Sequence, residues 1–127
     1  MEPTKYWTWH MFAGVVLLLV LGLHMLVMHM PATSPWFVPY GTQPDSLRNS
    51  LFRDAKLFFT VTYVLLLGVA LYHGLYGLRT ILFARTLKPA IEKTVTDVLL
   101  VLGLTLFCIG SWAALAAHSV ALAGAGG

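Results

Sequence analysis

One short run of this 127-residue chain combines residue types that can bind a prosthetic group inside a long apolar stretch. The run is His73-Gly74-Leu75-Tyr76-Gly77-Leu78-Arg79. An ionisable side chain in hydrocarbon is costly unless something binds it, so His73 marks a candidate functional site. A neutral imidazole offers a lone pair to iron, and glycines leave flat room beside it for a porphyrin. The pattern therefore favours haem, with His73 as axial ligand and Arg79 placed to pair with a propionate.

Each of these residues also has a purely structural interpretation. A buried histidine such as His73 can hydrogen-bond across a helix pair, and the Gly74–Gly77 segment can be a helix-packing notch. Arg79 can be a side chain whose charge reaches the membrane surface. Tyr76 shares a helix face with His73 and Gly77, which is compatible with either interpretation. The two interpretations remain open on the sequence.

A second histidine, His24, lies in an earlier apolar stretch. At 1.5 Å per residue, His24 and His73 each lie roughly 25 Å into their predicted helices. Successive spans run in opposite directions, so the two imidazoles are predicted at different depths, as two haems stacked across a membrane would require. Neither histidine can then supply the second ligand of the other's iron. The sequence thus predicts a partner with matching histidines.

The composition predicts an integral membrane protein. The chain is 58% hydrophobic and 10% charged, with a mean hydropathy of +0.79, whereas soluble domains carry roughly 25% charged residues. Its long apolar runs approach the roughly 20 residues that a bilayer requires. We predict an all-α fold with one domain over 1–127 and transmembrane helices at about 6–30, 53–84 and 94–119. Such a fold would be part of a helical bundle that a partner subunit completes.

The connections and helix ends have their own signals. The proline- and aromatic-rich segment 31–41 predicts an irregular loop on the outer membrane surface, and Asp45 or Ser46 is a candidate cap of a short amphipathic lead-in to the second span. Pro89 predicts a turn, after which Thr94 or Thr96 would begin the third span. Small residues along one side of that span favour close helix approach; they are Gly103, Gly110, Ala114 and Ala117.

The charges serve best as topology signals. A net charge of +3 is too small and too scattered to suggest nucleic acid as a partner. Lys5 and the basic residues around the second connection lie on one side, so the positive-inside rule predicts a cytoplasmic N-terminus and an outer C-terminus in the cell (inner) membrane. Trp9 and His10 then lie at the inner level, where a quinone headgroup would be in reach. The first segment is interpreted as a retained span because its apolar core is longer than that of a signal peptide.

The motif at residues 73–79 resembles the His-Gly-x-x-Gly-x-Arg signature of cytochrome b membrane anchor subunits in the succinate dehydrogenase and fumarate reductase family. Gly14, Leu17, His24 and Met25 are similar to the Gly-x-x-Leu…His-Met pattern of the di-haem members. The resemblance covers nearly the whole chain in its length and three-helix layout. It implies a subunit of the respiratory chain that holds a flavoprotein and an iron–sulfur subunit on the membrane, with a second anchor subunit beside it.

The resemblance also implies roles for individual residues. His73 would be the axial ligand of the haem b nearer the cytoplasm, His24 the ligand of a second haem b nearer the outer face, and Arg79 would face a propionate or the quinone region. Electrons would pass between the iron–sulfur subunit and membrane quinone, while dicarboxylate chemistry would belong to the flavoprotein. This chain would then be a non-catalytic electron-transfer subunit of an enzyme complex.

One stretch departs from the family pattern. Many relatives have an Asp-Tyr pair at the end of the second span that is associated with quinone, and here the equivalent residues are Phe83-Ala84-Arg85. Either the partner anchor supplies these side chains or quinone binds elsewhere. Apart from this departure, two other functions also stay open. One is a small cytochrome b anchor of another membrane dehydrogenase or hydrogenase. The other is a haem-free membrane scaffold in which the histidines pack or relay protons.

Overall fold

The computed structural model describes residues 3–29, 46–84 and 88–125, and nearly all of these residues are helical. The elements are α1 (Pro3–His29), α2 (Leu47–Asp54), α3 (Leu57–Phe83) and α4 (Pro89–Ala125). Three of them, α1, α3 and α4, are long and apolar enough to cross a membrane. The expected all-α membrane fold is confirmed. The predicted loop at 31–41, the candidate cap Asp45 and Arg85 lie outside the described residues.

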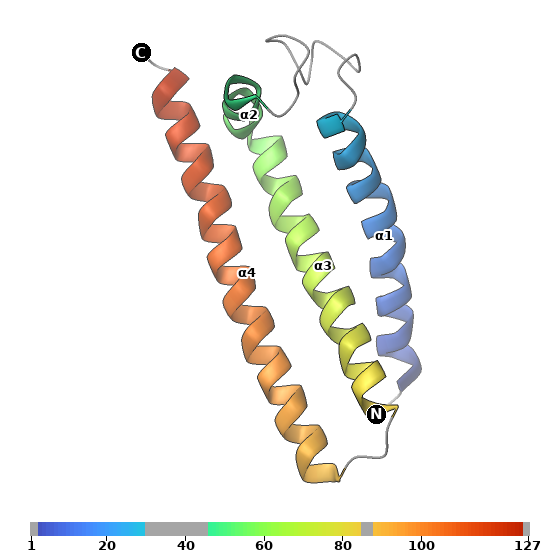
Figure 1. Cartoon of the computed structure of the whole chain (residues 1–127). Coiled ribbons are helices and arrows are strands. Elements are labelled where there is room, and N and C mark those ends of the chain that lie inside the picture. Colours follow the sequence, from blue (N-terminus) through green and yellow to red (C-terminus); the bar gives the residue numbers. More distant parts are fainter. Residues whose placement is uncertain (1–2, 30–45, 85–87, 126–127) are drawn as a thin grey trace.

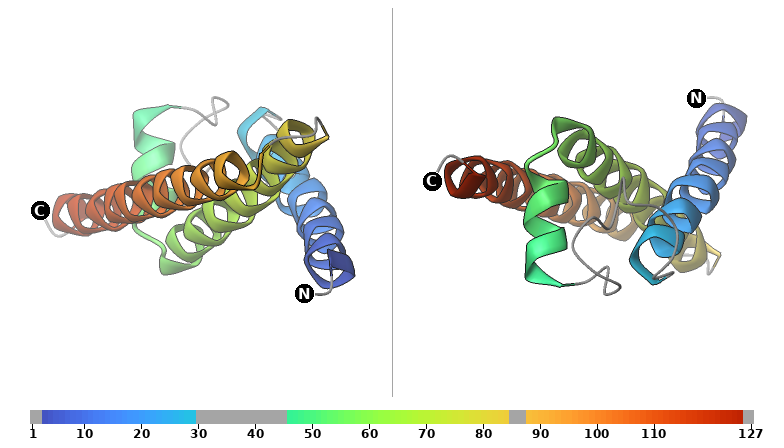
Figure 2. Two further views of the ribbon diagram at one scale, coloured as in Figure 1. Left: turned by 90° about the horizontal axis from the view of Figure 1, so that it is seen from below. Right: turned by 90° about the horizontal axis from the view of Figure 1, so that it is seen from above.

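The long helices stand side by side as an open row instead of a closed bundle (Figure 1). α3 is the middle member and packs against both α1 and α4, while α1 and α4 make no contact with each other within the described residues. The end-on views place α1 and α4 on opposite sides of α3 (Figure 2). Most of the large apolar side chains of the row are consequently exposed on its two faces. Lipid can cover such faces, and so can a partner subunit.

Glycines on α4 and α3 set the close approach of these two helices. A Cβ added at Gly103 would lie 2.6 Å from Leu75 Cδ1, and one added at Gly110 would meet the side chain of Leu67. In the other direction, a Cβ at Gly68 would lie 3.2 Å from the Phe107 ring. Without a driving force from water, helices in lipid gain most from such backbone proximity. The small residues of the third span thus act within the chain at Gly103 and Gly110.

The lead-in helix is confirmed and lies across the end of α3 and α4 (Figure 1). Ser46 is its N-cap, since the Ser46 hydroxyl accepts a hydrogen bond of 3.4 Å from the Asn49 backbone N–H. Its polar side faces the protein, with Asn49 and Arg53 buried, whereas Leu47 is 76% exposed. An apolar outer face of this kind is typical of a helix that lies in the membrane interface.

Three predicted helix boundaries were wrong. The second span does not begin at residue 53, because Arg53 and Asp54 end α2 and the chain turns at Ala55 and Lys56 before α3. The third helix begins at Pro89 instead of residue 94 and continues to Ala125 instead of residue 119. Proline is well tolerated in a first helical turn, and the small residues of the tail continue the helix.

The threonines assigned to the start of the third span are interior helix residues. The Thr94 hydroxyl donates to the Ala90 carbonyl at 3.0 Å, and the Thr96 hydroxyl donates to the Glu92 carbonyl at 2.8 Å. These bonds return to the preceding turn of the same helix, so neither side chain caps it. They also satisfy the two hydroxyls without help from water.

Candidate functional site

His73 and His10 form a stacked pair between α3 and α1. Nδ1–H of His73 donates to the His10 backbone carbonyl at 3.0 Å, and the two rings are nearly parallel, with centroids 4.1 Å apart and planes 8° apart. Because a carbonyl can only accept, this bond places the imidazole proton of His73 on Nδ1 and leaves its lone pair on Nε2. Nε2 of His73 has no hydrogen-bond partner among the residues that the structure describes.

Each helix of the pair carries a glycine one turn beyond its histidine. Gly14 follows His10 by four residues, and a Cβ there would lie 2.9 Å from Cε1 of His73. Gly77 follows His73 by four residues, and a Cβ there would be in ordinary contact with Cε1 of His10, at 3.5 Å. The His-x-x-x-Gly spacing therefore occurs twice, and Gly14 is the glycine that makes room for the ring of the other helix. Gly74 differs, since nothing lies within 4 Å of its Cβ position.

Two tyrosines strengthen this contact. The Tyr72 hydroxyl donates to the Tyr6 carbonyl at 3.1 Å, one helical turn before the carbonyl that His73 uses. The Tyr76 ring lies 4.9 Å from the His10 ring between centroids. His10 itself has an enclosed Nδ1 without a hydrogen-bond partner among the described residues, and such a nitrogen costs free energy in an apolar setting.

Arg79 does not join the histidine pair. Its Nε–H donates to Thr96 Oγ1 on α4 at 3.1 Å, and its guanidinium carbon lies 4.3 Å from the centre of the Phe83 ring. His73 faces α1, whereas Arg79 faces α4. His73 and Arg79 belong to one sequence motif, yet their side chains contact different neighbours of α3.

Trp9 and His10, which were predicted near a quinone, also separate. The Trp9 ring packs edge-on against Phe12 with centroids 5.8 Å apart, and Trp9 lines a hollow of about 270 Å³ between α1 and α3. Tyr72 and Gly68 contribute to the same hollow from α3. The His10 ring is instead covered by His73. Of the two, Trp9 is therefore the residue that an apolar molecule in this hollow would touch.

His24 lies at a second level of the α1–α3 contact. Its ring meets the Tyr63 ring edge-on, with centroids 5.9 Å apart. Fourteen residues separate His24 from His10, which is about 21 Å along a helix. The predicted separation of His24 and His73 along the membrane is consistent with this spacing, because His73 lies at the level of His10.

A polar cluster around α2 lies beyond His24. Arg53 is 1% exposed, hydrogen-bonds the Tyr63 side chain, and donates from Nη2 to Ser50 Oγ at 3.4 Å. From α4, the His118 Nδ1–H donates to the Asp54 carbonyl at 2.6 Å. Burial raises the pKa of the Asp54 carboxyl above its usual value, and the nearby charges of Arg53 and His118 partly offset that rise. The cluster joins α2 to both α3 and α4.

Several residues of these contacts were not predicted as site residues. The sequence did not single out Arg53, Tyr63, Tyr72 or His118. The repeated His-x-x-x-Gly spacing at His10 and His73 is a signal that could have paired the two histidines. No comparable pattern marks Arg53, because its burial depends on how α2 turns back onto the row.

The donor set limits what the chain can bind by itself. Within the described residues, no group of three or more His, Cys, Asp or Glu side chains can hold a metal ion. Haem iron needs one or two axial ligands instead, and a neutral imidazole whose Nδ1 is fixed by a backbone carbonyl is suited to that role. His73 has the tautomer that this role requires, and its Nε2 lies in the contact between α1 and α3, 3.8 Å from the position of a Cβ at Gly14.

The fold defines the chain as an all-α membrane protein, with three candidate spans in the part that the structure describes. Comparison with protein families, with curated proteins and with solved structures finds no match.

Proposed function

We propose that this chain is a haem b-binding membrane anchor subunit of a succinate:quinone or quinol:fumarate oxidoreductase. The observation that carries the proposal is the hydrogen bond from His73 Nδ1 to the His10 carbonyl. It fixes the tautomer and the ring orientation of His73, and it leaves Nε2 without a partner in the described part of the chain. When a histidine binds a metal through one ring nitrogen, a hydrogen bond from its other ring nitrogen orients the ring in this way.

His10 acts on His73 in this proposal instead of on quinone. Its carbonyl holds the proton on Nδ1, and its stacked ring limits rotation of the His73 side chain. Haem b, when bound, carries one electron at a time between the iron–sulfur subunit and quinone. His24 is proposed for a second haem b, at the level of Tyr63. Trp9 is proposed to line the quinone path, in the hollow that it shares with Tyr72.

A second subunit is part of the proposal because the row of helices is open. α1 and α4 do not meet in the described structure, so the faces of α3 are not enclosed by this chain. The second axial ligand of each iron would come from a second anchor subunit. A flavoprotein and an iron–sulfur protein would complete the complex at the membrane surface.

Difference spectroscopy tests the proposal. In the complex purified from membranes, a reduced-minus-oxidised spectrum should show b-type bands, and His73→Ala and His24→Ala should each remove about one haem per complex. His118→Ala is the matched control, since that imidazole also donates to a carbonyl but is assigned no iron. An assembled complex without b-type bands, or one in which His73→Ala keeps its full haem content, would refute the haem assignment.

The haem-free scaffold is the second candidate, and the same contact favours it. Polar side chains in lipid often form hydrogen bonds between neighbouring helices for packing alone. The bond from His73 to the His10 carbonyl joins two helices of the same chain in this way. The spectrum separates these two candidates. Sequencing of the copurified subunits separates succinate or fumarate chemistry from the cytochrome b anchor of another dehydrogenase or hydrogenase.

A further inference from the structure

A long hollow runs along the contact between α3 and α4 and is separate from the histidine pair. Its volume is about 390 Å³. Gly68 and Phe107 line one end, and Arg79 and Thr96 line the other. Eleven residues separate these ends on each helix, which corresponds to a length of about 16 Å. The lining between them is almost wholly apolar, and the Tyr72 hydroxyl is bonded to Tyr6 on α1. The hollow therefore suits a single hydrocarbon chain.

Arg79 places a positive charge at one end of this hollow. Its Nε–H is used by Thr96, whose own hydroxyl proton goes to the Glu92 carbonyl. The Phe83 ring supports the guanidinium from one side. The two terminal nitrogens of Arg79 have no hydrogen-bond partner among the residues that the structure describes. The guanidinium is therefore fixed in place and still has donors for an anion.

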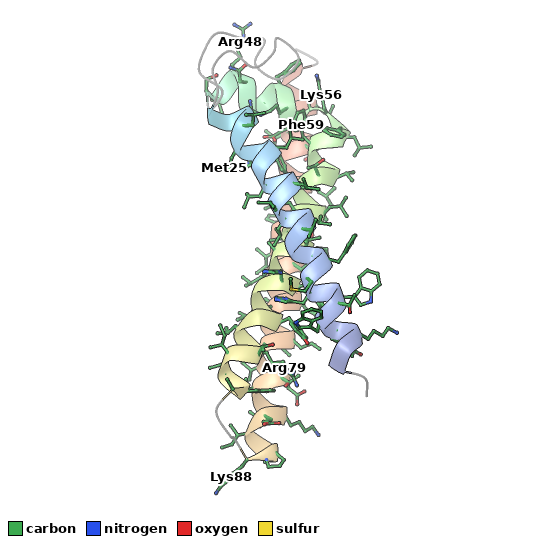
Figure 3. The ribbon with its side chains drawn as sticks, turned by 90° about the vertical axis from the view of Figure 1, so that its right-hand side faces the viewer. Met25, Arg48, Lys56, Phe59, Arg79 and Lys88 are labelled. Atoms are coloured by element: carbon green, nitrogen blue, oxygen red, sulfur yellow. The ribbon has the colours of Figure 1, made fainter. Side chains whose placement is uncertain are left out.

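Arg79 lies toward the end of the helix row where exposed lysines gather, as expected for a residue near the membrane surface. Lys88 and Lys93 are exposed near the same end of the row, and Figure 3 places Arg79 and Lys88 toward the end opposite Arg48 and Lys56. Glu92 and Asp97 are also on this part of α4, but neither lines the hollow. Arg79 is the charged residue of the lining.

We propose that the α3–α4 hollow binds one acyl chain of an anionic phospholipid, whose phosphate accepts hydrogen bonds from Arg79. An arginine fork matches phosphate geometry in two parallel bonds. In phosphatidylcholine a choline cation lies beside the same phosphate and repels Arg79, whereas an anionic lipid has no such cation. Basic residues at a membrane surface attract anionic lipids in the same way. The chain then lies against the apolar wall between Arg79 and Gly68. This binding does not depend on the haem proposal, because Arg79 faces away from His73.

Lipid retention in the purified complex tests the proposal. The complex is stripped with detergent, incubated with vesicles of dioleoylphosphatidylglycerol or of dioleoylphosphatidylcholine, and examined by native mass spectrometry. We expect one phosphatidylglycerol to remain bound and phosphatidylcholine to be lost. Arg79→Gln should weaken retention about 10- to 100-fold, the factor expected for a hydrogen bond to a charged group. Lys93→Gln is the control, since it removes a charge at the same end but outside the hollow.

A second variant keeps the charge and fills the hollow. Leu104 is 58% exposed and lines the hollow, so Leu104→Trp should block the acyl chain and abolish retention while Arg79 is intact. Haem content should be unchanged in all three variants. The proposal is overturned if the wild-type complex retains no phosphatidylglycerol, as it would with a partner helix in the hollow. Equal retention of both lipids, or loss of haem from Arg79→Gln with its lipid still bound, would overturn it as well.

Discussion

Adding a single methyl group at Gly14 should break the contact that orients His73. A Cβ at this position would lie 2.9 Å from Cε1 of His73, whereas two carbon atoms pack best at about 3.5–4.0 Å. The imidazole must therefore move by about 0.6–1 Å. It cannot do so freely, because Nδ1 is bonded to the His10 carbonyl at 3.0 Å and the ring is stacked on His10. A shift of that size takes the hydrogen bond beyond its useful length.

The expected loss of stability is the sum of three contributions. Overpacking costs typically about 1–3 kcal/mol, and the lost hydrogen bond adds about 0.5–1.5 kcal/mol. Replacing glycine by alanine within a helix returns roughly 0.5–1 kcal/mol. Gly14→Ala should therefore lower the free energy of unfolding by about 0.5–4 kcal/mol. In the haem-loaded complex, the same change should also lower the haem content.

The assay is reversible unfolding in mixed detergent micelles, followed by circular dichroism. Gly22→Ala is the matched control on the same helix, because nothing lies within 4 Å of its Cβ position. The double variant Gly14→Ala/His73→Ala should lose less stability than the sum of the single variants, since removal of the ring relieves the clash. If Gly14→Ala is as stable as Gly22→Ala, the reasoning on the histidine–glycine contact is refuted.

Three further predictions concern the polar cluster and the α3–α4 contact. Arg53→Ala should cost about 2–3 kcal/mol because it removes hydrogen bonds of a buried charged group, whereas Arg48→Ala, an exposed position, should change the unfolding free energy by less than about 0.5 kcal/mol. Burial raises the pKa of Asp54, so the folded state holds this proton more tightly and the free energy of unfolding should fall as the pH rises from about 4 through the raised pKa; Asp54→Asn should flatten that slope in a pH series of unfolding curves. Gly110→Ala should force Leu67 aside and lower the thermal midpoint of the chain in detergent, and an unchanged midpoint would contradict the close approach of α3 and α4.

The long helices depend on local properties of the chain, and the sequence therefore predicts them well. Each span needs an apolar run of sufficient length, and the run is visible without knowledge of any partner. Ser46 was one of two candidate caps for the same reason, since a cap acts within three residues. The wrong start of the third helix has a local cause too. A threonine can cap a helix or lie in its interior. The hydrogen bond from the Thr94 hydroxyl to the Ala90 carbonyl shows that Thr94 lies in the interior.

Contacts between helices were harder to predict, because apolar helices in lipid have no water to define a buried side. The direction in which a side chain points then depends on which helix lies beside it. His10 illustrates this, because it was placed near quinone from its depth and is instead covered by His73. Arg79 is a second example. It belongs to the same sequence motif as His73, but its side chain bonds to Thr96 on α4, whereas His73 bonds to α1.

The sequence by itself thus determined an all-α membrane protein and the residues able to serve a cofactor. Its apolar runs specify spans, and the rarity of ionisable groups in hydrocarbon singles out His73. The tertiary structure decided which of these residues act together. Gly14 and His73 lie far apart in the chain, yet Gly14 leaves the space that the His73 ring occupies in the stacked pair. That pairing depends on the approach of α1 to α3, a distance that no local pattern contains.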